Sequence, residues 1–512
     1  MNLRRLLSTF LVPLLIPLCS ASAFALDDLD ELRSKVRGDD ERKRRTAVKA
    51  LAEVGSEAAW ELVIERLADD EPEVADQAQL ELARIDGEGA LELLHGRAAA
   101  RSKNALVRAR VAESLGRADR PLEPEELARL VKDTEPEVRR IAWWSVERSM
   151  GAGRLVEEDR DDLVDTARKA AGGDRDPAVR GAALIALSEL APAVAIEEAS
   201  DALRPKQPEP VRMAAMAALA RAGRALPETL DAAIETVGRA VAEDRGSSLG
   251  LRFAAADALA RIRSRGAVEA LVDLLEVEEH PRLESSLVAR LRARTGAQFG
   301  NNPRGWRAWL EARPEDWVPL EGSGALEVDG SVARLAGLPL LSNRIAILID
   351  MSGSMWMERD GGGTLKELVD AELRTFLEKL PPETRFNLIP YATAPDPWSK
   401  QMVDATPRNV ARALEWFEKS RLRGKGSVWE AIDVALADED VDTVILLTDG
   451  APTGGLHWNL DLIVPLLLER NRFRHVAFDS ILTDPKPFLL RKWSALATGS
   501  AGVSVEVRFG AD

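Results

Sequence analysis

The sequence has a single cysteine, Cys19, and only four histidines among its 512 residues. Because a disulfide needs two cysteines, we expect the folded chain to be held together by its apolar cores. The histidines, at positions 95, 280, 457 and 475, form no His-x-x-x-His or His-Glu-x-x-His pair, so the common zinc motifs are excluded. No Gly-x-Ser-x-Gly motif is present, and Gly424-Lys425-Gly426-Ser427 lacks the first glycine of a phosphate-binding loop. These absences predict that the protein is not an enzyme.

The chain also lacks an excess of positive charge and a long apolar run. Its formal net charge is −16, and we find no basic stripe, which argues against nucleic acid or an anionic membrane surface as a partner. The longest apolar stretch lies within the first 20 residues and is too short to span a membrane. The length allows two or three domains.

The amino terminus has the order of a secretory signal peptide. Arg4 and Arg5 precede the apolar run 6–18, and small residues follow at 21–25. Residues 1–25 are therefore predicted to be a cleaved leader, cut near Ala23 or Ala25, and the protein to be exported to the periplasm or the extracellular space. The residues before Cys19 lack the small residue expected ahead of a lipidated cysteine, so we predict no lipoprotein anchor.

Residues 27–313 are repetitive. An apolar residue followed by arginine, with an aliphatic residue seven positions after the arginine, recurs with the arginine at 108, 139, 180, 212 and 252. Arg44 with Leu51, and Val74-Ala75 with Leu82, fit the same frame earlier in the chain. Several units open with an acidic residue and a proline, which is typical of a helix start. The units resemble short bacterial HEAT-like repeats. This resemblance implies an α-helical solenoid with one continuous core and an exposed inner surface.

The array is predicted to end with a divergent helix pair over 281–311. Trp306 and Trp309 are spaced to cover the end of the stack rather than to bind a partner. Residues 314–340, rich in proline, glycine and single acids, are predicted to be a connector that packs against both neighbouring parts.

The segment after the connector contains a pattern of oxygen ligands. The apolar strand 345–349 is followed by Asp350, Ser352 and Ser354 at alternate positions, which should meet at the carboxyl edge of a sheet. A second apolar strand, 444–447, is followed by Asp449, and the glycine-containing loop 424–427 presents Ser427. Carboxylate and hydroxyl oxygens suit a small hard cation.

At these five residues the chain resembles the von Willebrand factor type A (VWA) family and its metal-ion-dependent adhesion site. The family pattern is Asp-x-Ser-x-Ser, then a loop threonine, then an aspartate after a later strand. Ser427 departs from this pattern, since the family usually has threonine at that position. Serine keeps the hydroxyl but lacks the methyl group that helps to fix the rotamer of threonine. The resemblance implies that Asp350, Ser352, Ser354, Ser427 and Asp449 hold a divalent cation, expected to be Mg²⁺ with Mn²⁺ or Ca²⁺ as alternatives.

Strands and helices alternate through residues 341–512. Helices are predicted over 365–380, 410–417, 428–436, 460–468 and 489–497, and further strands over 385–391, 475–481 and 503–507. This order predicts a doubly wound α/β domain with a mainly parallel sheet.

The sequence thus favours an exported, non-enzymatic binding or scaffold protein. The resemblance implies that the VWA domain engages an Asp or Glu of a protein partner through the cation. Two alternatives stay open: a metal-dependent hydrolase, and a structural envelope protein with an inactive metal site. The sequence leaves the oligomeric state undetermined.

Overall fold

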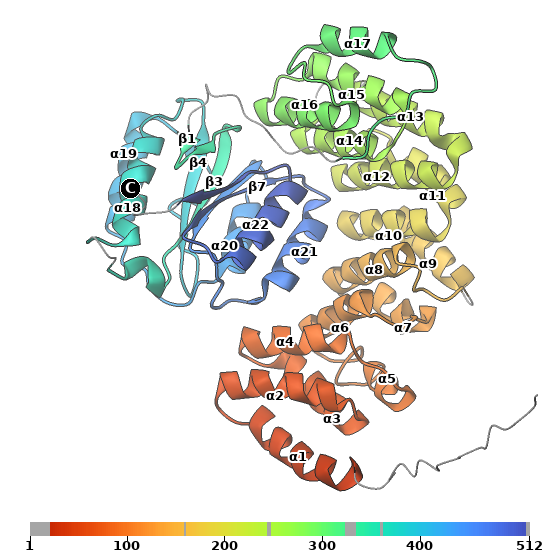
Figure 1. Cartoon of the computed structure of the whole chain (residues 1–512), viewed down its shortest axis with the longest axis vertical. Coiled ribbons are helices and arrows are strands. Elements are labelled where there is room, and N and C mark those ends of the chain that lie inside the picture. The colour runs from red at the N-terminus through yellow and green to blue at the C-terminus, as the bar shows by residue number, and fades with distance from the viewer. Residues whose placement is uncertain (1–20, 158–159, 243–246, 323–333, 359–361, 508–512) are drawn as a thin grey trace, which may run out of the picture.

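A curved array of helices surrounds one side of an α/β domain (Figure 1). This computed structural model describes residues 21–157, 160–242, 247–322, 334–358 and 362–507. Residues 1–20, which hold most of the predicted leader, lie outside the described residues.

The array consists of helices that follow one another closely along the chain. In order they are α1 (Ala21–Val36), α2 (Glu41–Val54), α3 (Glu57–Glu65), α4 (Pro72–Leu82), α5 (Glu88–Leu94), α6 (Ala105–Arg117), α7 (Pro124–Ala128), α8 (Pro136–Gly151), α9 (Arg160–Gly173), α10 (Pro177–Leu190), α11 (Pro192–Ala202), α12 (Glu209–Ala225), α13 (Leu230–Ala242), α14 (Leu249–Arg261), α15 (Arg265–Val277), α16 (Pro281–Thr295) and α17 (Pro303–Glu311). Proline occupies the first turn of α4, α8, α10, α12 and α16, where its missing N–H costs no hydrogen bond.

The arginine of the repeat motif joins neighbouring units. Arg108 donates to both carboxylate oxygens of Asp133 at 2.7 and 2.8 Å, and Arg139 donates in the same way to Asp174 at 2.8 Å. Each aspartate also accepts a backbone N–H two residues further on. Bidentate pairs of this kind fix orientation as well as distance, so the sequence motif is a cross-repeat clamp.

The end of the array is closed by tryptophans, as predicted. Trp306 of α17 is fully buried and packs edge-on against Phe299, with ring centroids 5.2 Å apart. Trp309 packs edge-on against Trp317, at 5.3 Å. Because Trp317 lies in the predicted connector, this contact also ties the connector to the array.

The connector reaches the second domain through a small hairpin. β1 (Arg334–Leu335) pairs antiparallel with β2 (Leu338–Pro339), and Leu335 and Leu338 are buried in the core of the α/β domain. At its other end, the backbone N–H of Leu320 donates to the carbonyl of Arg294 in α16 at 2.8 Å. The connector therefore packs against both parts, as expected.

The α/β domain has a six-stranded sheet in the order β5-β4-β3-β6-β7-β8, in which only the β4–β5 pair is antiparallel. The strands are β3 (Arg344–Asp350), β4 (Arg385–Tyr391), β5 (Val403–Asp404), β6 (Thr443–Thr448), β7 (Ala477–Thr483) and β8 (Ser504–Val507). The helices are α18 (Leu365–Leu377), α19 (Pro407–Glu418), α20 (Val428–Leu436), α21 (Leu460–Asn471) and α22 (Pro487–Gly499). The predicted helices and strands are present, and the fold class is confirmed.

The two faces of the sheet contribute to different cores. In β3, Ile345, Ile347 and Ile349 pack with α18 and α19, whereas Ala346 and Leu348 belong to the core that includes α20 to α22. This alternation follows from the period of two in a strand. The second core is continuous with that of the helical array.

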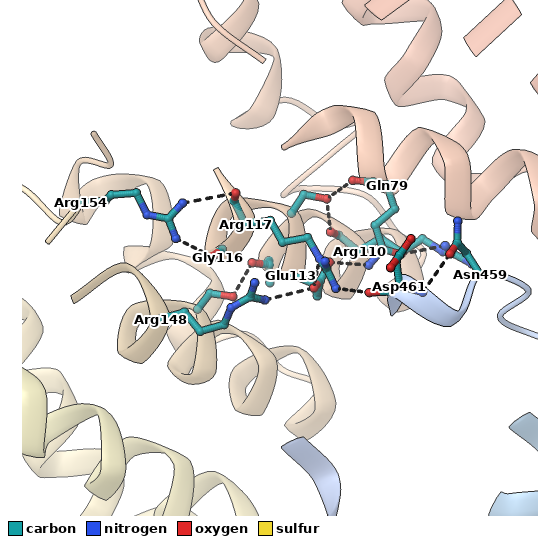
Figure 2. A network of polar contacts seen from close by, with 12 residues as sticks. Gln79, Arg110, Glu113, Gly116, Arg117, Arg148, Arg154, Asn459 and Asp461 are labelled. Carbon is teal, nitrogen blue, oxygen red and sulfur yellow. Dashed lines mark hydrogen bonds and ion pairs between the residues drawn. The ribbon is translucent and has the colours of Figure 1, made fainter. Parts of the chain in front are cut away.

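The inner surface of the array is not exposed, so that part of the prediction is wrong. The chain from the start of α21 to β7 runs along the inner helices α6, α8, α10, α14 and α16. Figure 2 shows one part of this contact, where Arg117 of α6 donates to the carbonyl of Asp461 at 2.7 Å. A side chain at Gly181 of α10 would come within 2.7 Å of the Phe473 ring. The close backbone approach at Gly181 requires a glycine there.

Candidate metal site

Three predicted ligands meet where β3 ends. Asp350 is buried, and its Oδ1 accepts the backbone N–H of Ser352 at 2.8 Å. The hydroxyl oxygens of Ser352 and Ser354 lie 3.2 Å apart. Ser352 is buried and Ser354 is exposed, so this group of oxygens reaches from the sheet edge to solvent.

The loop before α20 brings Ser427 to the same edge. Its backbone N–H donates to the carbonyl of Ala392 at 2.9 Å, and its hydroxyl donates to the carbonyl of Thr393 at 3.1 Å. The hydroxyl proton is therefore used, and the oxygen lone pairs are left as possible ligands. The neighbouring Gly426 lies beside Asp350, because a Cβ added to it would be 3.7 Å from Asp350 Oδ1.

The fifth predicted ligand, Asp449, directly follows β6 and is half-buried. Burial, and to a lesser degree the negative charge of Asp449, raise the pKa of the Asp350 carboxyl, against the hydrogen bonds it accepts from Ser352 and Thr448. Among the residues that the structure describes, no lysine or arginine forms an ion pair with either aspartate. The protein thus holds two close carboxylates without a cationic side chain of its own between them.

Sequence reasoning missed several residues that position these groups. Thr448 donates its hydroxyl to Asp350 Oδ2 at 2.8 Å. Thr453 accepts the backbone N–H of Gly426 at 2.6 Å. Tyr391 of β4 is fully buried beside Asp350, and burial together with the Asp350 charge raises the pKa of its phenol well above its ordinary value. The place of Thr448, immediately before Asp449 at a strand end, was a usable signal, whereas nothing local marked Thr453.

The donor set fits a hard divalent cation. Two carboxylates and three hydroxyls offer only oxygen, which suits Mg²⁺ better than a soft metal. Over the described segments, no three acidic, histidine or cysteine side chains gather into a metal-binding group. A cation held here would therefore rely on serine hydroxyls for part of its shell.

Comparison with known proteins supports the division into two parts. Residues 343–499 match the family described as von Willebrand factor type A domain, and residues 29–116 match HEAT repeats. The chain therefore has N-terminal HEAT repeats followed by a VWA domain. VWA domains are typically protein-binding modules, and neither domain type is usually catalytic.

Individual relatives match only in part. Inter alpha-trypsin inhibitor, heavy chain 4, of Mus musculus is 30% identical over 130 residues, which is 23% of this chain and 13% of that protein. The von Willebrand factor A domain-containing protein 3A of Homo sapiens is 29% identical over 114 residues, 22% of this chain and 9% of that protein. The solved VWA domain of SpRpn10 is 16% identical, with a TM-score of 0.25, over 32% of this chain and 87% of that one. The chain thus spans only a small fraction of the length of these curated relatives.

Proposed function

We propose that this protein is an exported, non-enzymatic scaffold whose VWA domain binds an Asp or Glu of a protein partner through a divalent cation. The cation is Mg²⁺, with Mn²⁺ or Ca²⁺ as alternatives, held by Asp350, Ser352, Ser354, Ser427 and Asp449. The observation that carries the proposal is the group of oxygens around Asp350 at the carboxyl edge of the sheet.

The charge of the site explains why a partner carboxylate would be needed. Only two of the five ligands, Asp350 and Asp449, carry a formal charge, and the other three are neutral hydroxyls. A bound divalent cation would attract a further anionic ligand, and Ser354 leaves the site open on the solvent side. An aspartate or glutamate from another protein would supply both the oxygen and the charge.

The surroundings of the site favour binding over catalysis. Hydrolysis would call for a base close to an activated water. The histidine nearest in sequence to Asp449 is His457, which is buried, lies 3.0 Å from Asp76, and packs edge-on against Trp429. Its ring is therefore occupied in the contact between the two domains.

Export is proposed from the order of charge, apolar run and small residues in the first 25 positions. In the part of the chain that the structure describes, no helix combines the length and apolarity of a membrane span. The protein would then meet its partner outside the cytoplasm.

Calorimetry with purified protein tests the metal site. Wild type should bind Mg²⁺, Mn²⁺ or Ca²⁺ at one site, Asp350→Ala should lose that binding, and Ser427→Thr should keep or strengthen it. Asp404→Ala is the matched control, because Asp404 is an exposed aspartate of the same domain in the edge strand β5. Failure of all three cations to bind wild type would refute the metal site.

A pull-down from envelope extract then tests the partner. A captured protein should be released by EDTA, lost with Asp350→Ala and retained with Asp404→Ala. Replacing an acidic residue of the captured protein should abolish binding without affecting its fold. Capture that survives both EDTA and Asp350→Ala would mean that the domain binds through another surface.

A further inference from the structure

A cavity of about 1020 Å³ lies between the helical array and the VWA domain. The array contributes residues of α8, α12, α14 and α16, and the VWA domain contributes residues of α21 and α22 and the segments before β7 and β8. The amino ends of parallel strands share one edge of a sheet, so these segments place the cavity opposite the carboxyl edge that carries Asp350. The cavity is therefore separate from the proposed metal site.

The wall of the cavity carries more positive than negative charge, in a protein that is acidic overall. Six arginines line it, against three acidic side chains. Each acid is already engaged: Glu147 pairs with Arg221 and Arg472, Asp257 pairs with Arg290, and Glu469 pairs with Arg472. The acids thus pair with three of the arginines, and among the described residues the other three have no ion pair.

The three arginines without an ion pair are Arg224, Arg261 and Arg294, which lie in the last turns of α12, α14 and α16. Within the described residues, no hydrogen bond or ion pair holds the side chain of Arg224 or Arg261. Arg294 donates to two neutral carbonyls, those of Ala260 and Leu320.

A purely structural reason would be attraction of each cation to the negative end of its helix. That attraction acts on all three arginines, and backbone carbonyls hold Arg294 in place, but within the described residues no hydrogen bond holds the side chain of Arg224 or Arg261. Burial lowers the pKa of Arg261, and the positive charges of Arg221, Arg290 and Arg224 lower it further, against the attraction of Asp257. The side chains are thus gathered against their mutual repulsion.

We propose that this cavity binds a small ligand that carries several phosphate groups. The planar guanidinium fork matches a phosphate with two parallel N–H bonds, and three forks from consecutive repeats would serve more than one group. Ser494 and Thr498 add hydroxyl donors from the opposite wall. Buried Trp144 and Phe253 give apolar surface for the rest of the ligand. The volume suits a small molecule.

The test is calorimetry of the full chain with inorganic tripolyphosphate, in EDTA so that no divalent cation contributes. Wild type should bind one equivalent, and the triple variant Arg224→Gln, Arg261→Gln, Arg294→Gln should bind at least about tenfold more weakly. The matched control replaces three exposed arginines outside the cavity, Arg97, Arg101 and Arg304, by glutamine and should bind within about twofold of wild type.

Two further arms keep the test decisive. The single variants Arg224→Gln and Arg261→Gln each remove a guanidinium that holds no hydrogen bond or ion pair within the described residues, so they can be used if the triple variant does not fold, and each should weaken binding. Citrate should bind more weakly than tripolyphosphate, because its carboxylates carry less charge and fewer oxygens per group. Equal binding by wild type and the cavity variants, or tighter binding of citrate, would overturn the proposal.

Discussion

Replacement of Arg282 by methionine should uncouple the VWA domain from the helical array. Arg282 is in the first turn of α16, and its two terminal nitrogens lie 2.6 and 3.0 Å from the carboxylate oxygens of Asp479 in β7. Both side chains are about 1% exposed. Asp479 also accepts the backbone N–H of Val503 at 2.7 Å, and Arg282 also donates to the carbonyl of Ala501 at 3.1 Å. The pair therefore crosses the domain boundary at a site that is shielded from solvent.

The size of the effect follows from which charge is left behind. Arg282→Met leaves a buried carboxylate without its cation, which typically costs about 3–5 kcal/mol. We expect the lower end of that range, since the Val503 N–H still serves one oxygen. Asp479→Asn leaves the Arg282 guanidinium without its anion but keeps an acceptor for the Val503 N–H. We therefore expect a loss of about 2–3 kcal/mol in the free energy of unfolding. In the double variant neither charge remains, and the two costs should not add.

Wild type, the two single variants and the double variant form a double-mutant cycle. Urea unfolding, followed by circular dichroism and tryptophan fluorescence, would measure the free energy of unfolding of each. The coupling energy should be at least about 2 kcal/mol, and Arg282→Met should separate the transitions of the two domains. Arg307→Met serves as the control, because Arg307 is an arginine of the same array whose ion pairs with Asp273 and Glu276 are exposed; its cost should stay under about 1 kcal/mol. A coupling energy near zero, with both single variants close to wild type, would refute the buried pair.

Other predictions concern pH, autonomy and processing. Burial lowers the pKa of His475 in the folded protein, so the imidazole binds a proton more readily in the unfolded chain than in the folded one. The free energy of unfolding should therefore fall as the pH drops below about 6.5, and His475→Gln should flatten this fall in urea titrations. A chain truncated after Arg313 should keep strong helical circular dichroism but melt below the full chain, because the inner face loses its cover; an unfolded product would contradict this. Mass spectrometry of exported protein should find Phe24 or Leu26 at the N-terminus, and a lipidated Cys19 would contradict this.

The elements and their order could be read from local patterns. The strand β4 (Arg385–Tyr391) and the helix α20 (Val428–Leu436) have the predicted bounds, because apolar period and flanking breakers act over a few residues. The grouping of Asp350, Ser352 and Ser354 was predictable for the same reason, since all three leave one strand end. Thr453 could not be found, because only the folded loop brings it to Gly426.

The contact between the domains had no such local signal. Arg282 and Asp479 are 197 residues apart in the chain, and no spacing rule joins them. One hint was present: Asp479 interrupts the apolar strand 475–481, and a carboxylate at a buried position needs a partner. The resemblance to a HEAT-like solenoid predicted an exposed inner surface instead, because an isolated repeat array keeps that surface free.

The same contact ties the proposed metal site to the first repeats. Asp76 of α4 is fully buried, and it accepts the backbone N–H groups of Trp458 and Asn459 at 2.6 and 2.8 Å in the loop that follows Asp449. Lys425, two residues before Ser427, forms an ion pair at 2.8 Å with Glu71, which precedes α4. Two of the three segments that carry the proposed ligands are thus attached to one helix of the array. Because the buried Asp76 carboxylate stays bonded to the backbone N–H groups of Trp458 and Asn459, it holds their loop in one position. A partner that binds at Asp350 would therefore meet the edge of the VWA domain and the N-terminal repeats as one continuous surface.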